Sequence, residues 1–399
     1  MISLQEAQSY VDGLATPLSA RSVPVGASTG MVLAHDVVST VSVPTFDNSA
    51  MDGFAVRSAD GTADRVIVGT QYAGLDRGLV VGPGEAVRIM TGAPMPAGAD
   101  AIVVVERADV VVSPDGVETL RHGESLEPGQ FVRRAGEDVA PGDVVLPHAT
   151  VITPAAVGVL ASLGLTNVEV IARPRVGVFS TGDELVSDGS DLAAGQIRDS
   201  NRPTLLAVVS RLGYEAIDLG CVPDDEDQIT AALVDGAAAC DVLLTSGGVS
   251  MGDADMIKRV MRSMADMRWM QVAIRPAKPL AAGLIGTTPI VGLPGNPVSA
   301  LLSFELFARR VIERRAGISK DRSLWFSAVV PDGLARRPDG KIHFPRVVVT
   351  SVDGAVVARP AGAQGSHQLA ASAAANAIAW LPDGDGVSPG GSVAVALLS

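Results

Sequence analysis

The sequence predicts a multidomain protein that combines an α/β domain with β-rich modules. Its length of 399 residues exceeds what a single hydrophobic core usually serves. Between about residues 173 and 318, apolar strand-like runs alternate with helical segments, a pattern typical of a parallel sheet with helices on both faces. Before and after this region, short strand-like runs are separated by Gly and Pro turns, which favours β modules.

The elements follow in chain order. Ser3 and Glu6 have the spacing of a capping box, so we expect a helix from about Leu4 to Leu14. Residues 25–139 are rich in Val, Gly, Pro and Asp, and we expect an all-β module there. Residues 140–172 return to strand and helix, with Pro154 opening the helix.

The alternating region begins with a strand over 176–180 and closes with a helix over 297–315. Between them we expect helices over 201–212, 225–239 and 255–264, and strands over 215–222, 241–246, 272–274, 281–285 and 289–293. Together these elements predict a doubly wound, parallel sheet. After residue 321, strand-like runs with Gly and Pro turns return, and they predict a small β-barrel or sandwich.

Composition excludes several function classes. The 44 acidic and 31 basic residues give a net charge of −13, which argues against a nucleic-acid partner or an anionic membrane surface. No apolar run approaches the roughly 18 residues of a membrane span, and the N-terminus lacks a signal-peptide pattern. Cys221 and Cys240 lie in apolar contexts without metal-ligand spacing. We expect a soluble, cytoplasmic protein with reduced thiols.

Polar, glycine-bearing turns follow four of the expected strands, at residues 180–184, 223–227, 245–255 and 293–297. In an open α/β sheet, ligands bind beyond the carboxyl ends of the strands, so these turns should meet at one edge. In the last turn, Asn296 has the position of an N-cap and Pro297 that of the first helical residue. This arrangement would direct backbone N–H groups and the positive end of the helix dipole toward an oxyanion.

Side chains in and beside these turns suit a phosphate-bearing ligand with a divalent cation. The glycine pair 247–248 permits positive-φ backbone that can form an anion nest. Three carboxylates are hard oxygen ligands for Mg²⁺, and two cations add fixed positive charge. Each feature alone also fits an ordinary capped turn, and it is their convergence that favours the ligand. The side chains concerned are Glu184, Asp224, Asp255, Arg275 and Lys278.

The β-rich module carries three further polar clusters, at residues 47–53, 89–96 and 133–138. Rigid loops of this kind suit the placement of a ligand, and they are equally typical of ordinary turns. The five histidines are scattered, and none has the spacing of a transition-metal site or of a Ser–His–Asp triad.

In order along the chain, these motifs resemble the molybdopterin molybdenumtransferase family, which includes bacterial MoeA and the E domain of gephyrin. The resemblance covers essentially the whole chain. It is carried by residues 47–56, 88–96, 136–138, 180–185, 199–201, 246–255, Pro279 and 293–297, and by the tail motif Gly365-Ser366, Ser372 and Ala375-Asn376.

The resemblance implies a reaction and an architecture. Molybdate would enter the dithiolene of adenylylated molybdopterin, and AMP would leave, in a Mg²⁺-dependent step that completes the molybdenum cofactor. The implied domains are a discontinuous linking and dimerisation domain (1–24 and 140–172), an inserted β-rich domain (25–139), a MogA-like α/β domain (173–318) and a C-terminal β-barrel (319–399). Transient contacts with molybdopterin adenylyltransferase and with recipient molybdoenzymes are also implied.

The resemblance further implies a homodimer whose site lies between the α/β domain of one subunit and the β-rich domain of the other. Glu184 and Asp255 match the carboxylates that hold Mg²⁺ or orient the phosphates, with Asp224 beside them. Asp52 and Thr91 match catalytic residues that reach in from the partner subunit. Residues that match substrate-binding positions are Ser180, Thr181, Gly182, Asp183, Ser246, Gly247, Gly248, Ser250, Arg275, Lys278, Pro294, Gly295, Asn296, Pro297, Asp138 and Arg346.

Two positions depart from the family pattern. The Pro-Gly-Lys-Pro turn of relatives has Ala277 in place of glycine, so a positive φ there would be costly. Arg275 stands where many relatives have lysine, which keeps the charge and changes its geometry.

Two other functions stay open at this point. A molybdopterin adenylyltransferase shares the α/β domain, but it lacks the flanking domains and its glycine turn typically continues Gly-Gly-Thr-Gly. A non-catalytic scaffold, a role that the gephyrin E domain also has, would tolerate loss of Glu184 and Asp255.

Overall fold

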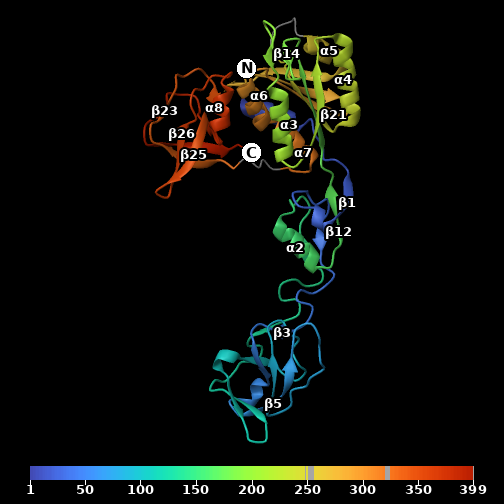
Figure 1. The fold of residues 1–399 in the computed structure, drawn as a ribbon, viewed down its shortest axis with the longest axis vertical. Coiled ribbons are helices and arrows are strands. Elements are labelled where there is room, and N and C mark those ends of the chain that lie inside the picture. The colour runs from blue at the N-terminus through green and yellow to red at the C-terminus, as the bar shows by residue number, and fades with distance from the viewer. Residues whose placement is uncertain (248, 250–255, 320–323, 399) are drawn as a thin grey trace. The chain divides into compact units, whose positions relative to one another are not determined.

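The computed structural model describes residues 1–247, 249, 256–319 and 324–398. The chain forms two compact units (Figure 1). The first comprises Met1–Val23, Gly30–Ala34 and Glu169–Ser399, and the second comprises Pro24–Thr29 and His35–Val168. Among the described residues, no helix combines the length and the apolar character needed to cross a membrane.

The first unit is built on a six-stranded sheet with the order β16-β13-β17-β21-β20-β18. As predicted, β16 (Glu215–Val222), β13 (Arg175–Thr181), β17 (Val242–Ser246) and β21 (Thr288–Leu293) run parallel. However, β20 (Pro279–Ile285) pairs antiparallel with β21, and β18 (Asp266–Gln271) pairs antiparallel with β20. The prediction of an entirely parallel sheet is therefore wrong at this edge. Only residues 286 and 287 separate β20 from β21, whereas a parallel pair needs a crossover of about a dozen residues.

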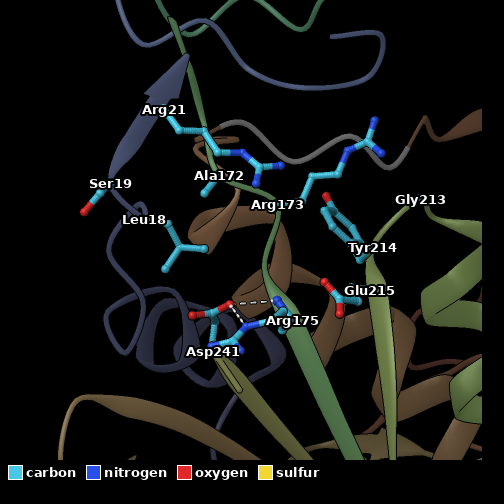
Figure 2. Close-up of a pocket in the computed structure, with 10 residues that line it drawn as sticks. All are labelled: Leu18, Ser19, Arg21, Ala172, Arg173, Arg175, Gly213, Tyr214, Glu215 and Asp241. Carbon is cyan, nitrogen blue, oxygen red and sulfur yellow. Dashed lines mark hydrogen bonds and ion pairs between the residues drawn. The ribbon is translucent and has the colours of Figure 1, made fainter. Parts of the chain in front are cut away.

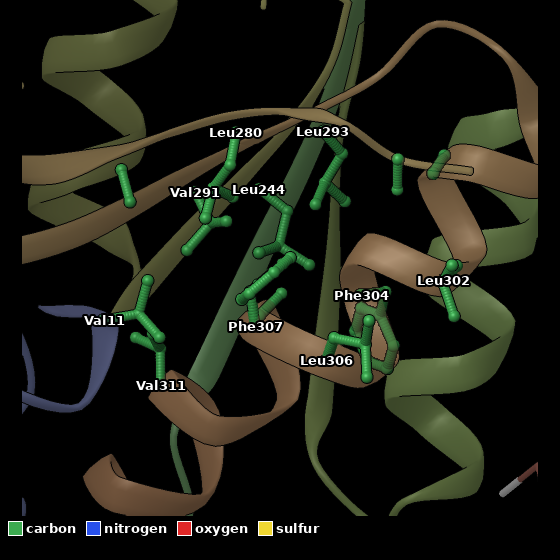
Figure 3. Packing of buried hydrophobic residues seen from close by; sticks show 14 of the residues in the cluster. Val11, Leu244, Leu280, Val291, Leu293, Leu302, Phe304, Leu306, Phe307 and Val311 are labelled. Carbon is green, nitrogen blue, oxygen red and sulfur yellow. The ribbon is translucent and has the colours of Figure 1, made fainter. Parts of the chain in front are cut away.

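Helices cover both faces of the sheet, as the alternating pattern predicted. One face carries α1 (Leu4–Asp12), α3 (Asn201–Arg211), α6 (Pro297–Ser303), a π-helical turn (η4, Phe304–Ala308) and α7 (Arg309–Arg315). The other face carries α4 (Glu226–Ala239) and α5 (Met256–Met264). Phe304 and Phe307 of the π-helical turn are buried in the same core as Leu244 and Val291 of the sheet (Figure 3).

Helix α1 begins with the predicted capping box. The Glu6 N–H donates to Ser3 Oγ at 3.1 Å, and the Ser3 N–H donates to Glu6 Oε2 at 2.7 Å. Val11 on its apolar side joins the core of the α/β sheet, and Asp12 accepts hydrogen bonds from Arg310 of α7. The helix thus packs on the sheet because its apolar stripe is buried there.

The C-terminal part forms a closed barrel, which decides between the barrel and the sandwich left open by the sequence. Its order is β22 (Phe326–Val330), β26 (Ala355–Pro360), β25 (Arg346–Val352), β27 (Ala377–Trp380) and β29 (Gly391–Leu397), with the short helix α8 at Leu369–Ala374. Phe344, Ile378 and Ala396 belong to the same hydrophobic cluster as the π-helical turn. A continuous core therefore joins the barrel to the α/β sheet.

The second unit contains a six-stranded sheet, in agreement with the predicted β-rich module. Its order is β7 (Ala101–Val104), β4 (Gly53–Val56), β6 (Glu85–Ile89), β5 (Arg65–Gln71), β9 (Glu118–Arg121) and β8 (Asp109–Val112). Helix α2 (Pro154–Ser162) begins at the predicted proline, and Thr153 Oγ1 caps it by accepting the Ala156 N–H at 3.2 Å.

Short strand pairs complete the fold. They are β1 (Ala20–Pro24) with β12 (Asn167–Ile171), β2 (Val37–Val38) with β11 (Val144–Leu146), β3 (Asn48–Ser49) with β10 (Val132–Arg133), β14 (Leu185–Val186) with β15 (Ile197–Arg198), β19 (Ile274–Arg275) with β24 (Ile342–His343), and β23 (Leu334–Ala335) with β28 (Gly386–Val387). The predicted four-domain boundaries stay a prediction, because the chain divides here into two compact units.

Candidate functional site

The four polar turns of the α/β domain meet at the carboxyl edge of the parallel strands, which we call the rim. The strand register aligns Ser180 with Ser246, and Ser246 with Leu293. On the other side, Thr181 is aligned with Val222, which precedes the turn containing Asp224. The structure therefore brings residues 180–184, 223–225, 245–247 and 293–297 together from distant parts of the chain.

Asn201, the first residue of α3, ties two of these turns together. Its Nδ2 donates to Ser246 Oγ at 2.7 Å and to the Gly295 carbonyl at 2.8 Å. The residue is 8% exposed, so both bonds form largely out of solvent. Sequence reasoning did not place Asn201 in the site, although it lies in the 199–201 motif at the start of α3.

Asp199 fixes the neighbouring strand end in a similar way. Its carboxylate accepts a hydrogen bond from Ser180 Oγ at 2.6 Å, and Arg202 Nε donates to the same Oδ2 at 3.0 Å. Arg202 also pairs with Asp218 of β16. Ser180 is completely buried, so it positions the rim rather than contacting a ligand from solvent.

Gly247 has a φ of +106°, and its position explains why a glycine is needed. A Cβ built there would lie 3.2 Å from the Thr181 carbonyl oxygen. Its N–H donates to the Leu293 carbonyl at 3.0 Å. The prediction that Gly247 offers its N–H to an anion is therefore wrong, because that donor holds two strand ends together. Gly248, Ser250 and Asp255 lie outside the described residues.

Three carboxylates lie close together at one end of the rim. The Asp224 N–H donates to Asp183 Oδ1 at 3.0 Å. Burial raises the pKa of Asp224, and the negative charges of Asp183 and Glu184 raise it further. A cation at this place would relieve that repulsion, so the donor chemistry fits Mg²⁺. Among the described residues, no three His, Cys, Asp or Glu side chains already converge in metal-binding geometry.

The start of α6 confirms one prediction and corrects another. Pro297 is the first helical residue, and Asn296 has the extended backbone of an N-cap. However, the Asn296 side chain makes no capping hydrogen bond. The Val298 N–H donates to the Ser366 carbonyl at 3.2 Å, so a loop of the barrel satisfies a donor that we had expected to face a ligand.

Arg275 and Lys278 precede β20, and both side chains are exposed. Because β20 is antiparallel to β21, with Ala281 aligned with Gly292, the start of β20 lies beside the end of β21. This register brings Lys278 to the rim. Arg275 lies 4.0 Å from Asp339 and lines a cavity of about 640 Å³ together with residues of the barrel.

Ala277 has a φ of +69° and is buried. The turn therefore holds a left-handed residue, although the sequence has alanine rather than glycine at this position. An L-residue in this region costs roughly 1–2 kcal/mol, so the departure is accommodated at a cost in stability.

Arg346 supports the barrel instead of offering its charge to a ligand. It is 4% exposed, and burial lowers its pKa. Its Nη1 donates to the Gln368 carbonyl at 2.7 Å and to Ser372 Oγ at 3.0 Å, and its Nη2 donates to the Ala363 carbonyl at 2.8 Å. The predicted substrate contact is not available to this side chain, because its donors fix residues 363–372.

The three polar clusters of the second unit also come together. Asp52 Oδ1 accepts the Thr91 N–H at 2.6 Å and Thr91 Oγ1 at 2.7 Å, and these bonds lower the pKa of Asp52. Asp47 Oδ2 accepts Arg134 Nη1 at 2.6 Å, which joins the first and third clusters. The Asp138 N–H donates to the Val43 carbonyl at 3.0 Å. The carboxylates of Asp52 and Asp138 lie on exposed residues, as a ligand-facing role requires.

Three family profiles match successive parts of the chain. They are the MoeA N-terminal region (domain I and II) over residues 2–164, the probable molybdopterin binding domain over 177–314, and the MoeA C-terminal region (domain IV) over 330–398. The chain is 37% identical over 401 residues to molybdopterin molybdenumtransferase of Haemophilus influenzae, covering 99% of this chain and 98% of the relative. It is 39% identical to molybdopterin molybdenumtransferase 2 of Mycobacterium tuberculosis, covering 96% of each.

The similarity extends to the three-dimensional fold. A crystal structure of the molybdopterin biosynthesis moeA protein from Pyrococcus horikoshii OT3 aligns with a TM-score of 0.82 and 27% identity, over 100% of each chain.

Proposed function

Because this chain belongs to the molybdopterin molybdenumtransferase family of molybdenum cofactor biosynthesis, we propose that it inserts molybdate into adenylylated molybdopterin with release of AMP in a Mg²⁺-dependent reaction. The observation that carries this proposal is the rim, where turns from four strands lie together. A nucleotide with a charged pterin tail needs both anionic metal ligands and cations. The rim has carboxylates at one end and Lys278 at the other.

Glu184 and Asp255 are the residues that we propose to hold Mg²⁺, with Asp224 beside them. When bound, the cation would supply charge neutralisation for the phosphates. The repulsion among Asp183, Glu184 and Asp224 supports this role, because it is what a cation would relieve.

The remaining chain residues would bind and orient the substrate. Lys278 and Arg275 are exposed cations that can pair with phosphate or molybdate oxygens, and hydroxyl and amide groups of the rim can bond the nucleotide. Asn201 and Asp199 act through other residues, by fixing Ser246, Gly295 and Ser180. These hydrogen bonds preorganise the rim, and a preorganised rim can hold two reactants in the orientation that the reaction requires.

We further propose that Asp52, Thr91 and Asp138 complete the site from a partner subunit, in a cytoplasmic homodimer. The support is that three loops of the second unit gather these polar groups on exposed residues without closing them off. Transient contact with molybdopterin adenylyltransferase and with recipient molybdoenzymes would pass the substrate in and the cofactor out.

The decisive experiment is nucleotide release from adenylylated molybdopterin in the presence of molybdate and Mg²⁺. Glu184→Ala should lower the rate by about a hundredfold or more, since it removes a ligand of the phosphate-bound cation. Glu169→Ala, which removes an exposed carboxylate from β12, is the matched control and should keep the parent rate. Equal rates for Glu184→Ala and the parent protein would show that the metal assignment is wrong.

A further inference from the structure

A second cavity, of about 620 Å³, lies at the opposite edge of the α/β sheet (Figure 2). It borders the N-terminal ends of the parallel strands: Arg175 and Glu215 begin β13 and β16 and are aligned with each other, and Asp241 directly precedes β17. Since β13 has seven residues, the cavity is about 20 Å from the rim at the strand rise of about 3.3 Å per residue. It is therefore separate from the proposed active site.

The surroundings of this cavity are positively charged in a chain whose net charge is −13. Three arginines line it: Arg21, Arg173 and Arg175. A fourth, Arg315, donates from its Nε to the Asp241 carbonyl at 3.2 Å. Two carboxylates, on Glu215 and Asp241, oppose the three arginines that line the cavity. The local excess of positive charge favours an anionic ligand.

One acid–base pair is already formed inside the cavity wall. The Arg175 N–H donates to Asp241 Oδ2 at 2.8 Å, and Arg175 Nε lies 3.5 Å from the same oxygen (Figure 2). Arg175 and Asp241 therefore neutralise each other to a large extent. The other side of the cavity carries two further arginines, Arg21 and Arg173.

That other side is formed by two chain segments that lie next to each other. The Ala172 N–H donates to the Ser19 carbonyl at 3.2 Å, which places Arg21 and Arg173 on neighbouring segments. Both arginines are exposed. Within the part of the chain that the structure describes, the guanidinium of Arg21 makes no hydrogen bond or ion pair, so it is available to a ligand.

The size of the cavity limits the kind of ligand. A volume of about 620 Å³ falls in the range of roughly 300–1,000 Å³ that is typical of small-molecule sites, and it exceeds what a single inorganic ion fills. Arginine is the residue that best matches the geometry of phosphate oxygens. The Tyr214 ring adds an aromatic surface to the wall.

We propose that this cavity binds a small phosphate-bearing molecule, with Arg21 and Arg173 holding its phosphate. The ligand would bind independently of the substrate at the rim. Binding would also link the segments around residues 19–21 and 172–173, which precede and follow the second unit in the chain.

The test uses inorganic pyrophosphate as the probe and isothermal titration calorimetry on the full chain. We expect saturable binding that weakens by at least about tenfold in the double variant Arg21→Gln/Arg173→Gln. Arg359→Gln, an exposed arginine of the barrel, is the matched control and should keep the parent affinity. Arg21→Lys retains the positive charge and should fall between the parent and the double variant.

Lys278→Gln separates the cavity from the rim. The proposal expects the binding event that the double variant weakens to persist in Lys278→Gln. It is overturned if pyrophosphate does not bind, if the double variant binds like the parent, or if Lys278→Gln alone abolishes binding. If the double variant does not fold, as judged by its thermal unfolding, the single exposed change Arg21→Gln takes its place under the same criteria.

Discussion

Replacement of Asn201 by alanine tests whether the rim is held in shape by a single amide. The substitution removes two hydrogen bonds that connect α3 to the ends of β17 and β21, over separations of 45 and 94 residues. No local element can replace such long-range contacts. We therefore expect both a loss of stability in the first unit and a loss of activity.

The size of the effect follows from the two acceptors. Each hydrogen bond contributes about 1 kcal/mol net, and a buried acceptor left without a partner costs about 1–3 kcal/mol. Ser246 is buried, whereas Gly295 is exposed and can be hydrated after the change. We expect the free energy of unfolding of the first unit to fall by about 2–3 kcal/mol. Displacement of the turn by about 1 Å would lower nucleotide release by up to about a hundredfold.

Tryptophan fluorescence during denaturant unfolding is a suitable assay, because Trp269, Trp325 and Trp380 all belong to the first unit. Thr204→Ala in the same helix is the control. It removes a hydroxyl whose hydrogen bond at 2.8 Å goes to the Ser200 carbonyl of its own helical turn, and we expect less than about 1 kcal/mol.

A second variant, Asn201→Asp, tests whether the amide group of Asn201 holds the rim. Asn201→Asp keeps the shape of the side chain but replaces its NH₂ donor with an oxygen that faces the Gly295 carbonyl, which can only accept. It should be at least as damaging as Asn201→Ala. If both variants unfold within about 0.5 kcal/mol of the parent protein and release nucleotide at the parent rate, the amide does not hold the rim.

Three further predictions concern other parts of the molecule. If the site is shared between subunits, a mixed dimer with Thr91→Ala on one chain and Glu184→Ala on the other has one intact site and one site that carries both changes. Such dimers should recover up to about half of the parent rate of nucleotide release. If no nucleotide release is recovered, the site is not composite. Ala277→Gly should raise the thermal stability of the first unit by up to about 1 kcal/mol, because it relieves a positive φ, and calorimetry would measure the shift. Burial, and then the adjacent charge of Arg65, lower the pKa of His122, so the unfolded chain binds more protons at acid pH. The second unit should therefore lose stability as the pH falls below about 6.5, and His122→Gln should flatten that profile in circular-dichroism unfolding curves. A parent-like slope in His122→Gln would assign the pH dependence to other groups.

Local signals in the sequence were sufficient for most elements of the fold. The capping box at Ser3 and the proline of α2 each mark a helix start to within a residue, because both depend on chemistry within one turn. The sequence also predicted that the four polar turns meet, because the carboxyl ends of parallel strands lie at one edge of the sheet.

Other features depend on contacts that no local pattern encodes. The direction of β20 is decided by a two-residue connection and by pairing with β21, and the apolar run alone fits either direction. Arg346 resembles an available cation in the sequence, but its donors are used by a loop about 20 residues further along the chain. Asn201 looks like an ordinary first residue of a helix until its two distant acceptors are known.

Because β20 runs antiparallel to β21, the register in which the two strands pair determines where Lys278 lies, and therefore affects which ligand the rim can bind. Lys278 owes its location to the hydrogen-bond ladder that matches Ala281 with Gly292. Inserting one residue within β20 would slide this cation by about 3.3 Å and turn the side chains beyond the insertion to the opposite face of the sheet. Changes of length in the hairpin tip at residues 286–287 would leave that ladder intact. The tip can therefore vary in length during evolution, whereas the number of residues in β20 must stay the same.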